Sequence, residues 1–280
     1  MQKRAWAKAV GGALIFALGL IACVHQGVAR GCAAGNVCDD FETYAVGAAP
    51  GGRWLTQLDQ GEAIVDSTRA FSGNHSVRIT SGGHRTAFIA LEGAPLFPVA
   101  NDNLYGRMMV FLEAAPQTNV HWTLIEAQGR IAETNDLAEL RYGGQHPITS
   151  NGAFVGSQLM ANYETPEWYA TGHGPKTDCW HHADESVVMP TGRWVCVAWQ
   201  FDGAHDRMRF SLDGQPISSL NVDGVGEGCV HQPASYPWRS PVFNRLNLGW
   251  ASYQDDGDRH VWIDDVAVGS TPQPCPSPHS

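Results

Sequence analysis

The segment from Arg245 to Gln254 carries polar residues that suit chemistry on a sugar. Alternate residues of an extended strand point to the same face, so Arg245, Asn247 and Tyr253 are expected on one side. Only a glycine and an alanine stand between Asn247 and Tyr253 on that side, which leaves a smooth floor with a polar rim. We therefore predict a substrate-binding surface that contains Arg245, Asn247, Trp250 and Gln254.

His121 and Tyr253 are the residues that we expect to transfer protons. His121 opens a segment, residues 121–128, that has the composition of a strand. In β-elimination from a uronate, a base removes the C5 proton, and the carboxylate beside that carbon must be neutralised. We predict that Arg85 and Arg141 supply the positive charge. Two further substrate-binding candidates stand on neighbouring segments, Gln128 and Tyr163.

Each of these residues also has an interpretation without chemistry. Tyr253 would be a tyrosine at a rim with a solvated hydroxyl, and His121 a hydrogen-bonded histidine at a strand end. The arginines would be partners in salt bridges. His181 and His182 stand close to Cys179, which favours a loop closed by a disulfide bond over a metal site.

Several other activities lack their residues in this sequence. There is no GxSxG nucleophile elbow, no HExxH motif and no phosphate-binding glycine loop. Glu126, Glu133 and Glu139 fall in different segments, so the sequence shows no carboxylate pair for glycoside hydrolysis. The formal net charge of −10 argues against nucleic acid as a partner. The same charge would repel a polyanion unless arginines converge on its binding site.

Short strands separated by turns must position the candidate residues. Residues 76–80 alternate polar and apolar side chains, as a half-buried strand does, and no window has the 3.6-residue apolar stripe of a helix. Further strands are expected at 85–91, 105–112, 121–128, 137–142, 158–163, 194–201, 208–212, 245–253 and 261–268. This pattern is typical of an all-β sandwich, barrel or jelly roll. Residues 162–187 form the longest irregular segment, and long loops are often functional.

Three segments near the two ends resemble the calcium site of concanavalin-like jelly-roll domains. They are residues 39–42, the turn at 71–77 and residues 262–266. The resemblance implies a structural calcium ion that joins the first and last strands, because Ca²⁺ prefers hard oxygen ligands. The residues implied are Glu42, Ser72, His75, Asp264 and Asp265, with Asp264 favoured over Asp265. In the other interpretation these acids only decorate strand ends and turns.

The C-terminal half resembles the core domain of the cellulose-induced protein (Cip) family. The resemblance rests on Trp194-x-Cys196-x-x-Trp199-x-Phe201-Asp202-Gly203, on Leu248-Gly249-Trp250 and on Ile263-Asp264-Asp265-Val266. It implies an all-β, concanavalin-like jelly roll of two antiparallel sheets with bound calcium, similar to glucuronan and alginate lyases. In jelly-roll alginate lyases a strand tyrosine is the catalytic acid and base, beside a histidine on a central strand. The Gln-x-His motif of those lyases is replaced here by His121-Trp122-Thr123.

The N-terminus resembles the signal peptide of bacterial lipoproteins. Lys3, Arg4 and Lys8 precede the apolar run 9–22, which is short for a membrane span. The run ends in Leu20-Ile21-Ala22-Cys23, which resembles a lipobox and implies lipid modification of Cys23. Cleavage nearby without a lipid, for instance after Ala29, is the other interpretation. The chain is therefore expected to be exported, as a lipoprotein of the cell envelope or as a secreted protein.

Setting Cys23 aside leaves six cysteines. An even number in an oxidising compartment suggests three disulfide bonds, and the sequence leaves all 15 pairings open. We divide the chain into a signal peptide at 1–22, a tether at 23–37, a jelly-roll domain at 38–275 and a tail at 276–280. We expect a monomer that contacts the membrane only through its lipid.

The sequence thus predicts a polysaccharide lyase that cleaves an acidic plant or microbial polysaccharide. A second hypothesis is a carbohydrate-binding module without catalysis, in which aromatic side chains stack on sugars. Its candidate platforms are Trp168, Tyr169, Trp180 and Trp250. A third hypothesis is an envelope protein with only a structural role.

Overall fold

The computed structural model describes residues 32, 35–167 and 177–276. The expected signal peptide, Cys23, nearly all of the tether, Trp168 and Tyr169 lie outside the described residues. Within the described ranges, no helix has the length and apolar character needed to cross a membrane. The helical elements there are three short 3₁₀ turns at Ala100–Asp102, Gly203–His205 and Ser218–Leu220.

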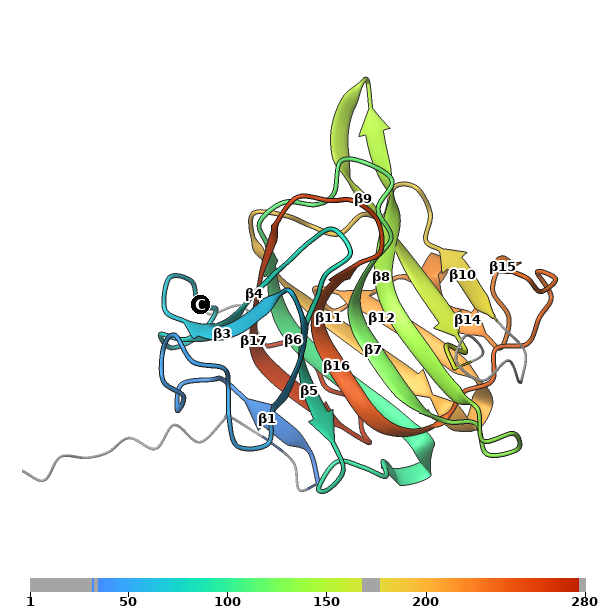
Figure 1. Ribbon diagram of the computed structural model, residues 1–280, viewed down its shortest axis with the longest axis horizontal. Helices are drawn as coiled ribbons and strands as arrows, with labels where there is room; N and C mark the ends of the chain where they lie inside the picture. The colour runs from blue at the N-terminus through green and yellow to red at the C-terminus, as the bar shows by residue number, and fades with distance from the viewer. Residues whose placement is uncertain (1–31, 33–34, 168–176, 277–280) are drawn as a thin grey trace, which may run out of the picture.

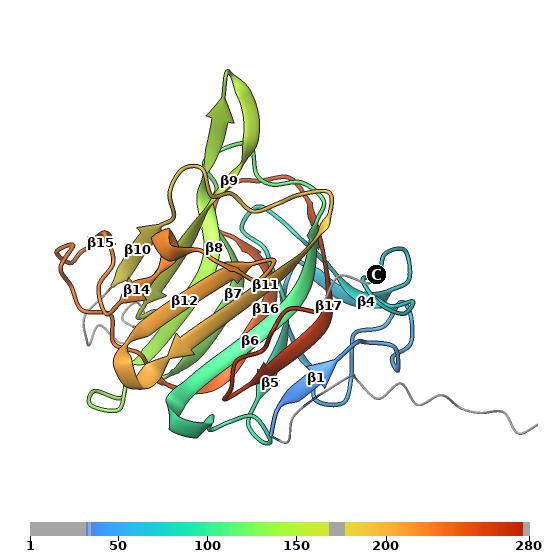
Figure 2. The same cartoon turned by 180° about the vertical axis from the view of Figure 1, so that it is seen from behind.

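Two antiparallel sheets pack against each other, as Figures 1 and 2 show from opposite sides. The first, sheet A, has the spatial order β13 (Gln215–Pro216), β12 (Arg207–Leu212), β11 (Trp194–Asp202), β6 (Asn103–Leu112), β17 (Arg259–Gly269), β4 (Ser76–Ser81) and β3 (Glu62–Asp66). Two short strands extend it: β1 (Val37–Asp39) pairs with β17, and β14 (Val222–Asp223) pairs with β12.

Sheet B forms the curved layer that faces the viewer in Figure 1. Its spatial order is β15 (Gly228–Val230), β10 (Asp178–His182), β9 (Ala153–Glu164), β8 (Leu137–Ser150), β7 (Trp122–Arg130), β16 (Val242–Ser252), β5 (Thr86–Glu92) and β2 (Leu55–Asp59). Strands distant in sequence are neighbours in both sheets, for example β7 and β16. This arrangement confirms the predicted all-β sandwich.

The ten predicted strands are all present, with ends shifted by a few residues. β8 and β9 are longer than predicted, because they continue beyond the sheet as the hairpin that projects at the top of Figure 1. The prediction of an irregular segment at 162–187 is wrong at β10. This strand pairs with β9 and β15, and the disulfide bond between Cys179 and Cys229 joins it to β15. Burial on one sheet face rather than composition decides its structure.

Alternate residues of each strand fill the space between the sheets. On β16, Leu246, Leu248 and Trp250 are fully buried in this core. The rings of Trp250 and Trp122 stack in parallel with their centroids 4.5 Å apart. Because burial of such large apolar surfaces is the main stabilising contribution to folding, the intervening residues of the same strands are fixed on the outer face.

The prediction of three disulfide bonds is confirmed. The pairs are Cys32–Cys38, Cys179–Cys229 and Cys196–Cys275. Cys196 stands on β11, so its bond holds the C-terminal segment against sheet A. The first and last strands also meet, since Val37 pairs with Val268 and Asp39 with Val266.

Candidate functional site

The outer face of sheet B carries three of the residues predicted on the segment from Arg245 to Gln254. The pairing of β16 with β7 has a register shift between Leu248 and Ala251, which marks a bulge at Gly249. Gly249 has a φ of 154°, and a Cβ there would overlap the carbonyl oxygen of Ala87. Tyr253, just after β16, continues the alternation of Arg245 and Asn247 and lies over the same face, with Arg141 against its ring.

Two lines of cross-strand partners cross this face. One runs through Asn247, Glu126, Arg141, Asn162 and Trp180, on strands β16, β7, β8, β9 and β10. The other runs through Glu92, Arg245, Gln128, Glu139, Glu164 and Asp178, on strands β5, β16, β7, β8, β9 and β10. Their core-facing neighbours are apolar, so sheet B has a polar strip on its outer side.

Arg141 lies at the centre of this strip and binds three glutamates. Its Nε is 3.0 Å from Glu126 Oε2, its Nη1 is 2.7 Å from Glu164 Oε2, and its Nη2 binds Glu139. The side chains of Arg141, Glu126 and Glu139 are only 6–8% exposed. We call Arg141 and its three partners, Glu126, Glu139 and Glu164, the Arg141 cluster. The positive charge of Arg141 is compensated by the three glutamates of the cluster.

Amides complete the hydrogen bonds of the cluster. Gln128 Nε2 donates to Glu126 Oε1 at 2.7 Å and to Glu139 Oε1 at 3.0 Å. Asn247 Nδ2 donates to Glu126 Oε1 at 2.7 Å. Burial is the largest influence on Glu139 and raises its pKa to about 7, with Arg141 opposing and the two other glutamates adding to the rise. The cluster therefore holds a proton up to near-neutral pH.

His121 and Tyr253 lie together at one end of the strip. Their ring centroids are 4.7 Å apart, and the guanidinium carbon of Arg141 is 5.5 Å from the centroid of the Tyr253 ring. The Tyr253 hydroxyl is 3.2 Å from Thr123 Oγ1. Backbone contacts fix the pair, because the Tyr253 N–H donates to the His121 carbonyl and the His121 N–H donates to Gln254 Oε1.

The surroundings shift the pKa values of these two side chains in opposite directions. Burial, followed by the positive charges of Arg141 and His182, lowers the pKa of His121 to about 3. Burial raises the pKa of Tyr253 to about 12, although Arg141 acts in the opposite direction. At neutral pH the imidazole therefore carries no charge and the phenol keeps its proton, and the same burial and positive charges weaken the imidazole as a base.

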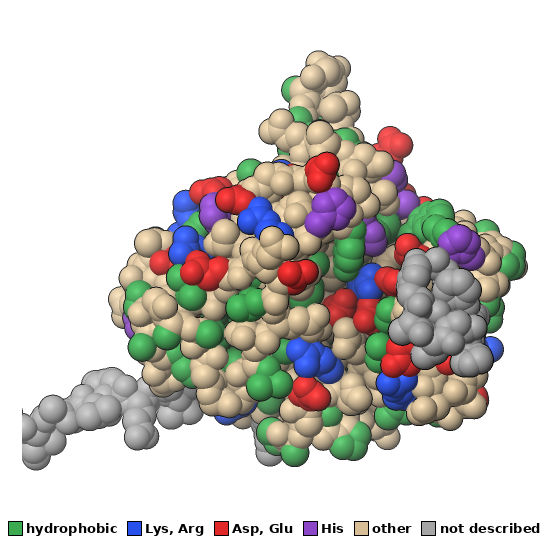
Figure 3. Space-filling model, in the orientation of Figure 1, with side chains coloured by type: hydrophobic (Ala, Val, Ile, Leu, Met, Phe, Trp, Pro, Cys, Tyr) green, Lys and Arg blue, Asp and Glu red, His purple; other side chains and the backbone are tan. Residues whose placement is uncertain are grey.

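Two more histidines lie further along the same face. His182, on β10, contacts Glu227 through Nδ1, and its ring centroid is 4.8 Å from that of His146 on β8. Its Nε2 is buried and has no hydrogen-bond partner among the described residues. Figure 3 shows acidic and basic side chains in a hollow near the middle of this face, with histidines above it.

Other predicted site residues lie elsewhere or are buried. Arg85 binds Asp258 and the Gly82 carbonyl, outside the Arg141 cluster. Trp250 and Tyr163 were predicted to bind substrate, and this is wrong, because both are 0–1% exposed and pack in the core. Tyr163 stacks on Trp238 there. Strand alternation explains both corrections, since Asn247 and Asn162 face outward and their neighbours one or three positions away face inward.

The sequence reasoning missed Glu126, Glu139, Glu164 and Asn162 as members of the site. Each belongs to a pair of polar residues two positions apart in an otherwise apolar strand. The pairs are Glu126 with Gln128, Glu139 with Arg141, and Asn162 with Glu164. That spacing places both members of a pair on one outer face of the sheet. It is the pattern in the sequence from which these residues could have been predicted. Strand pairing then makes carboxylates from three segments neighbours.

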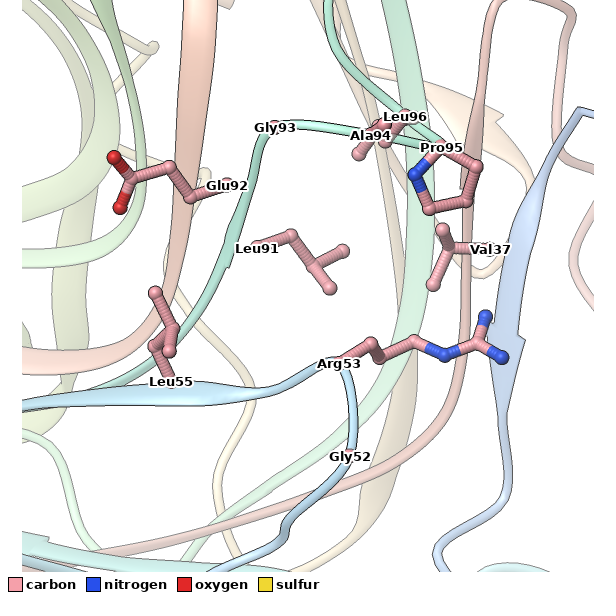
Figure 4. A pocket seen from close by; sticks show the side chains of 10 residues that line it. All are labelled: Val37, Gly52, Arg53, Leu55, Leu91, Glu92, Gly93, Ala94, Pro95 and Leu96. Carbon is pink, nitrogen blue, oxygen red and sulfur yellow. The ribbon is translucent and has the colours of Figure 1, made fainter.

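A separate cavity of about 260 Å³ lies where β2 and β5 meet the N-terminal segment. Its walls are mainly apolar, from Leu55, Leu91, Ala94, Pro95 and Leu96. In Figure 4 the carboxylate of Glu92 and the guanidinium of Arg53 point in opposite directions. The Glu92 carboxylate binds Arg245 at 2.9 Å, which connects one wall of this cavity to the polar strip.

The segments predicted to bind calcium meet at one turn. Glu42 Oε1 accepts hydrogen bonds from the backbone N–H groups of Asn74 and His75, at 2.8 and 2.6 Å. Asp264 Oδ2 accepts from Phe71 and Ser72, at 2.7 and 3.1 Å, and Asp265 Oδ1 accepts from the Ser72 hydroxyl. Across the described residues, no group of three or more His, Cys, Asp or Glu side chains is arranged to hold a metal ion.

The turn does bring together carboxylates, which are the ligand type that a hard cation prefers. Asp264 is fully buried, and burial, with a contribution from Asp265, raises its pKa to about 7. A divalent cation would stabilise this charge. Glu42, Asp264 and Asp265 offer carboxylate oxygens, whereas the ring nitrogen of His75 is not a calcium ligand, so that residue would contribute its carbonyl.

Comparison with known proteins agrees with this architecture. A family model described as polysaccharide lyase-like, Cip1-like core domain, matches residues 53–271. The solved structure of "Cellulose induced protein, Cip1" has a TM-score of 0.58 at 20% identity and covers 86% of this chain and 100% of that one. An endo-β-1,4-glucuronan lyase from the fungus Trichoderma reesei has a TM-score of 0.52 at 14% identity, with 82% and 95% coverage. No curated protein matches at a significant level.

The two solved structures are too distant in sequence to establish more than the jelly-roll fold. The family model covers most of the described residues, from the loop before β2 to the end of β17. The chain therefore belongs to the Cip1-like core-domain family of polysaccharide lyase-like proteins.

Proposed function

We propose that this protein is a polysaccharide lyase that cleaves a uronate-containing polysaccharide by β-elimination. The observation that carries the proposal is the contact of His121 with Tyr253 on the polar strip of sheet B. At neutral pH the imidazole is uncharged and the phenol keeps its proton, which are the starting states that a base and an acid need. A solved endo-β-1,4-glucuronan lyase has the same jelly-roll fold, which supports a uronate as substrate.

In the proposed reaction, the neutral imidazole of His121 takes the C5 proton of the uronate. The C4–O bond then breaks as a C4–C5 double bond forms, and the Tyr253 hydroxyl protonates the leaving oxygen. The phenolate and the imidazolium return to their starting states by proton exchange with each other or with water. No redox partner is needed, because the electron pair of the C–H bond becomes the new double bond.

The residues predicted to neutralise the substrate carboxylate take other roles in this proposal. Arg85 points to Asp258, and the charge of Arg141 is already matched by three glutamates. Arg141 thus acts as a positioning residue, which holds the cluster together beneath the Tyr253 ring. Gln128 and Gln254 remain the candidates for binding sugar hydroxyls, with Arg245 at the edge of the strip. Asn247 is 0% exposed and supports Glu126 from below, so its predicted contact with substrate is not retained.

The test is the ultraviolet absorbance of the unsaturated uronate on a panel that includes glucuronan and alginate. We expect product with the wild type and a loss of about 10²-fold or more with Tyr253→Phe or His121→Gln, as is typical of general acid–base groups. Tyr105→Phe is a matched control, because its hydroxyl binds Gln200 on sheet A, away from the strip. Absence of product on every polymer would overturn the proposal.

Glycoside hydrolysis is a second candidate, because Glu126 and Glu139 are neighbours and Glu139 holds its proton to about pH 7. Glycosidases use two neighbouring carboxyl groups, one of which has a raised pKa. New reducing ends without ultraviolet absorbance, lost in Glu139→Gln, would favour hydrolysis. Tight polysaccharide binding without either product would instead favour a binding module.

The calcium ion is proposed as a structural element of this domain. Glu42, Asp264, Asp265, the Ser72 segment and the His75 carbonyl would hold it, where the turn at 71–76 meets both ends of the chain. The ion would compensate the negative charges of these carboxylates. The proton-transfer residues lie on the other sheet, so this ion takes no part in the reaction.

Export and lipid attachment at Cys23 are proposed from the sequence of residues 1–23. An envelope-anchored domain would meet its polysaccharide outside the cytoplasm. Cells that express the wild type are expected to incorporate labelled palmitate into the protein and to retain it in the membrane fraction. The Cys23→Ser variant should lose the label. Equal labelling of the two proteins would contradict the proposal.

A further inference from the structure

The arginines and the exposed carboxylates around the polar strip are already paired with each other. Arg141 binds three glutamates, Arg245 binds Glu92, and Arg130 binds Glu167. A uronate that enters the strip would therefore find little free positive charge from these arginines. β-Elimination still requires a group that neutralises the carboxylate next to C5. Histidines stand beyond β9, on the same side of the sheet.

A carboxylate holds the ring of His182 in place. Its Nδ1 contacts Glu227 Oε1, and Glu227 Oε2 lies 4.0 Å from His181 Nδ1. The carboxylate at Nδ1 orients the ring, so that Nε2 is the ring atom left to bind a ligand. His182 is 14% exposed, and its Nε2 has no partner among the described residues. A buried donor without a partner costs stability, which a ligand oxygen would recover.

Strand pairing places His182 on the same outer face as the proton-transfer pair. His182 pairs with Met160, Met160 with Gly143, and Gly143 with Thr123. Thr123 in turn contacts the Tyr253 hydroxyl. Gly143, in the middle of this row, contributes no side chain. The two histidines are also close enough for the positive charge of His182 to lower the pKa of His121.

We propose that His182, supported by Glu227, binds and neutralises the substrate carboxylate through Nε2. This inference rests on the proposed lyase function and adds the residue that the arginines do not supply. The Nε2–H donates to one carboxylate oxygen, which disperses the negative charge that grows when His121 removes the C5 proton. His146, whose ring packs on His182, keeps that ring in place.

The test compares binding of a short oligoglucuronate with binding of its methyl ester. The ester has the same sugar rings and no charge to neutralise. Calorimetry is carried out in the Tyr253→Phe background, so that the ligand is not consumed. With His182→Gln or Glu227→Gln, we expect affinity for the acid to fall about tenfold or more and affinity for the ester to change little, as befits one lost charge-assisted hydrogen bond.

The matched control is His205→Gln. His205 also contacts a carboxylate, that of Asp202 at 2.8 Å, but it follows β11 of sheet A. Both ligands should bind this variant as tightly as they bind the protein that retains His205. Thermal unfolding of each variant checks that β10 and its disulfide bond are intact. Equal losses for acid and ester, no loss for the acid, or no binding of the acid at all would overturn the proposal.

Lyase assays separate this inference from the proposed function. If the wild type makes unsaturated product and His182→Gln retains its kcat/KM on the acid polymer, the function stands and the role of His182 falls. If the wild type makes no product but the acid-specific loss of affinity is present, the carboxylate site stands and the lyase proposal falls.

Discussion

Arg141 and Glu126 form an ion pair of 3.0 Å in which each side chain is only 6% exposed. The pair joins the central strands β8 and β7, and Glu139 and Glu164 bind the other two nitrogens of the same guanidinium. Removal of the arginine would leave three acids buried without a cation, which is more costly than the loss of the attraction itself.

We therefore expect Arg141→Gln to lower the free energy of unfolding by about 3–5 kcal/mol, the usual cost of breaking a buried pair. Urea titration measures the change. Arg130→Gln is the matched control, because Arg130 pairs with Glu167 at an exposed position and should contribute less than about 1 kcal/mol. Similar small losses in both variants would contradict the account of the cluster.

The pKa of His121 gives a second prediction. Because burial, Arg141 and His182 lower that pKa to about 3, the imidazole should remain neutral throughout the mildly acidic range. NMR titration of the wild type, with His121→Gln used to assign the signal, should show no protonation of this ring above about pH 4. An imidazole that titrates near its ordinary value of 6.5 would contradict the site geometry.

Stability in the presence of a chelator should depend on pH through Asp264. Its folded-state pKa is raised to about 7, above the ordinary value of 3.8, so the folded protein binds the proton more tightly than the unfolded chain. The resulting stability is complete below the unfolded pKa and is lost as pH rises through about 7. Glu139 contributes with the same sign.

We expect the Tm of the chelated protein to fall between pH 4 and pH 7, measured by calorimetry, and the fall to be smaller in Asp264→Asn. Asparagine carries no charge whose burial grows more costly as pH rises. A decline in Tm that is as steep in Asp264→Asn as in the wild type would show that other groups control it.

Calcium should stabilise the folded protein at neutral pH if it binds at the turn. At a concentration of 100 times Kd, the stabilisation is about 2.7 kcal/mol. Differential scanning fluorimetry with and without calcium measures it. Glu42→Gln should reduce the effect, and Glu113→Gln, away from the turn, should not. A wild type whose Tm is unchanged by calcium and by chelator would argue against the ion.

The two disulfide bonds at the ends of the chain should differ in importance. Cys196–Cys275 closes a separation of 79 residues and Cys32–Cys38 one of 6. By the entropy of loop closure, replacement of both cysteines by serine should cost about 4 kcal/mol for the first pair and about 2 kcal/mol for the second. Denaturant unfolding compares the two variants, and a larger loss for Cys32–Cys38 would contradict the loop argument.

The sequence by itself determined the strands, the all-β class and the number of disulfide bonds, and its resemblance to jelly-roll domains implied the two-sheet sandwich and the meeting of the first and last strands at one turn. The strands and the class follow from local alternation of polar and apolar residues, and the disulfide number from the cysteine count. The resemblance rests on two acidic segments and the turn between them. The same alternation predicted Asn247 and Tyr253 on one face, and the structure places both there.

Only the tertiary structure decided which segments are neighbours and which candidates are accessible. Glu126, Glu139 and Glu164 come together because β7, β8 and β9 pair in a particular register, and no local pattern specifies that register. Trp250 and Tyr163 are in the core because burial of large rings stabilises the sandwich. The contact of His182 with Glu227 depends on β10, whose position is set by its pairing with β9 and its disulfide bond.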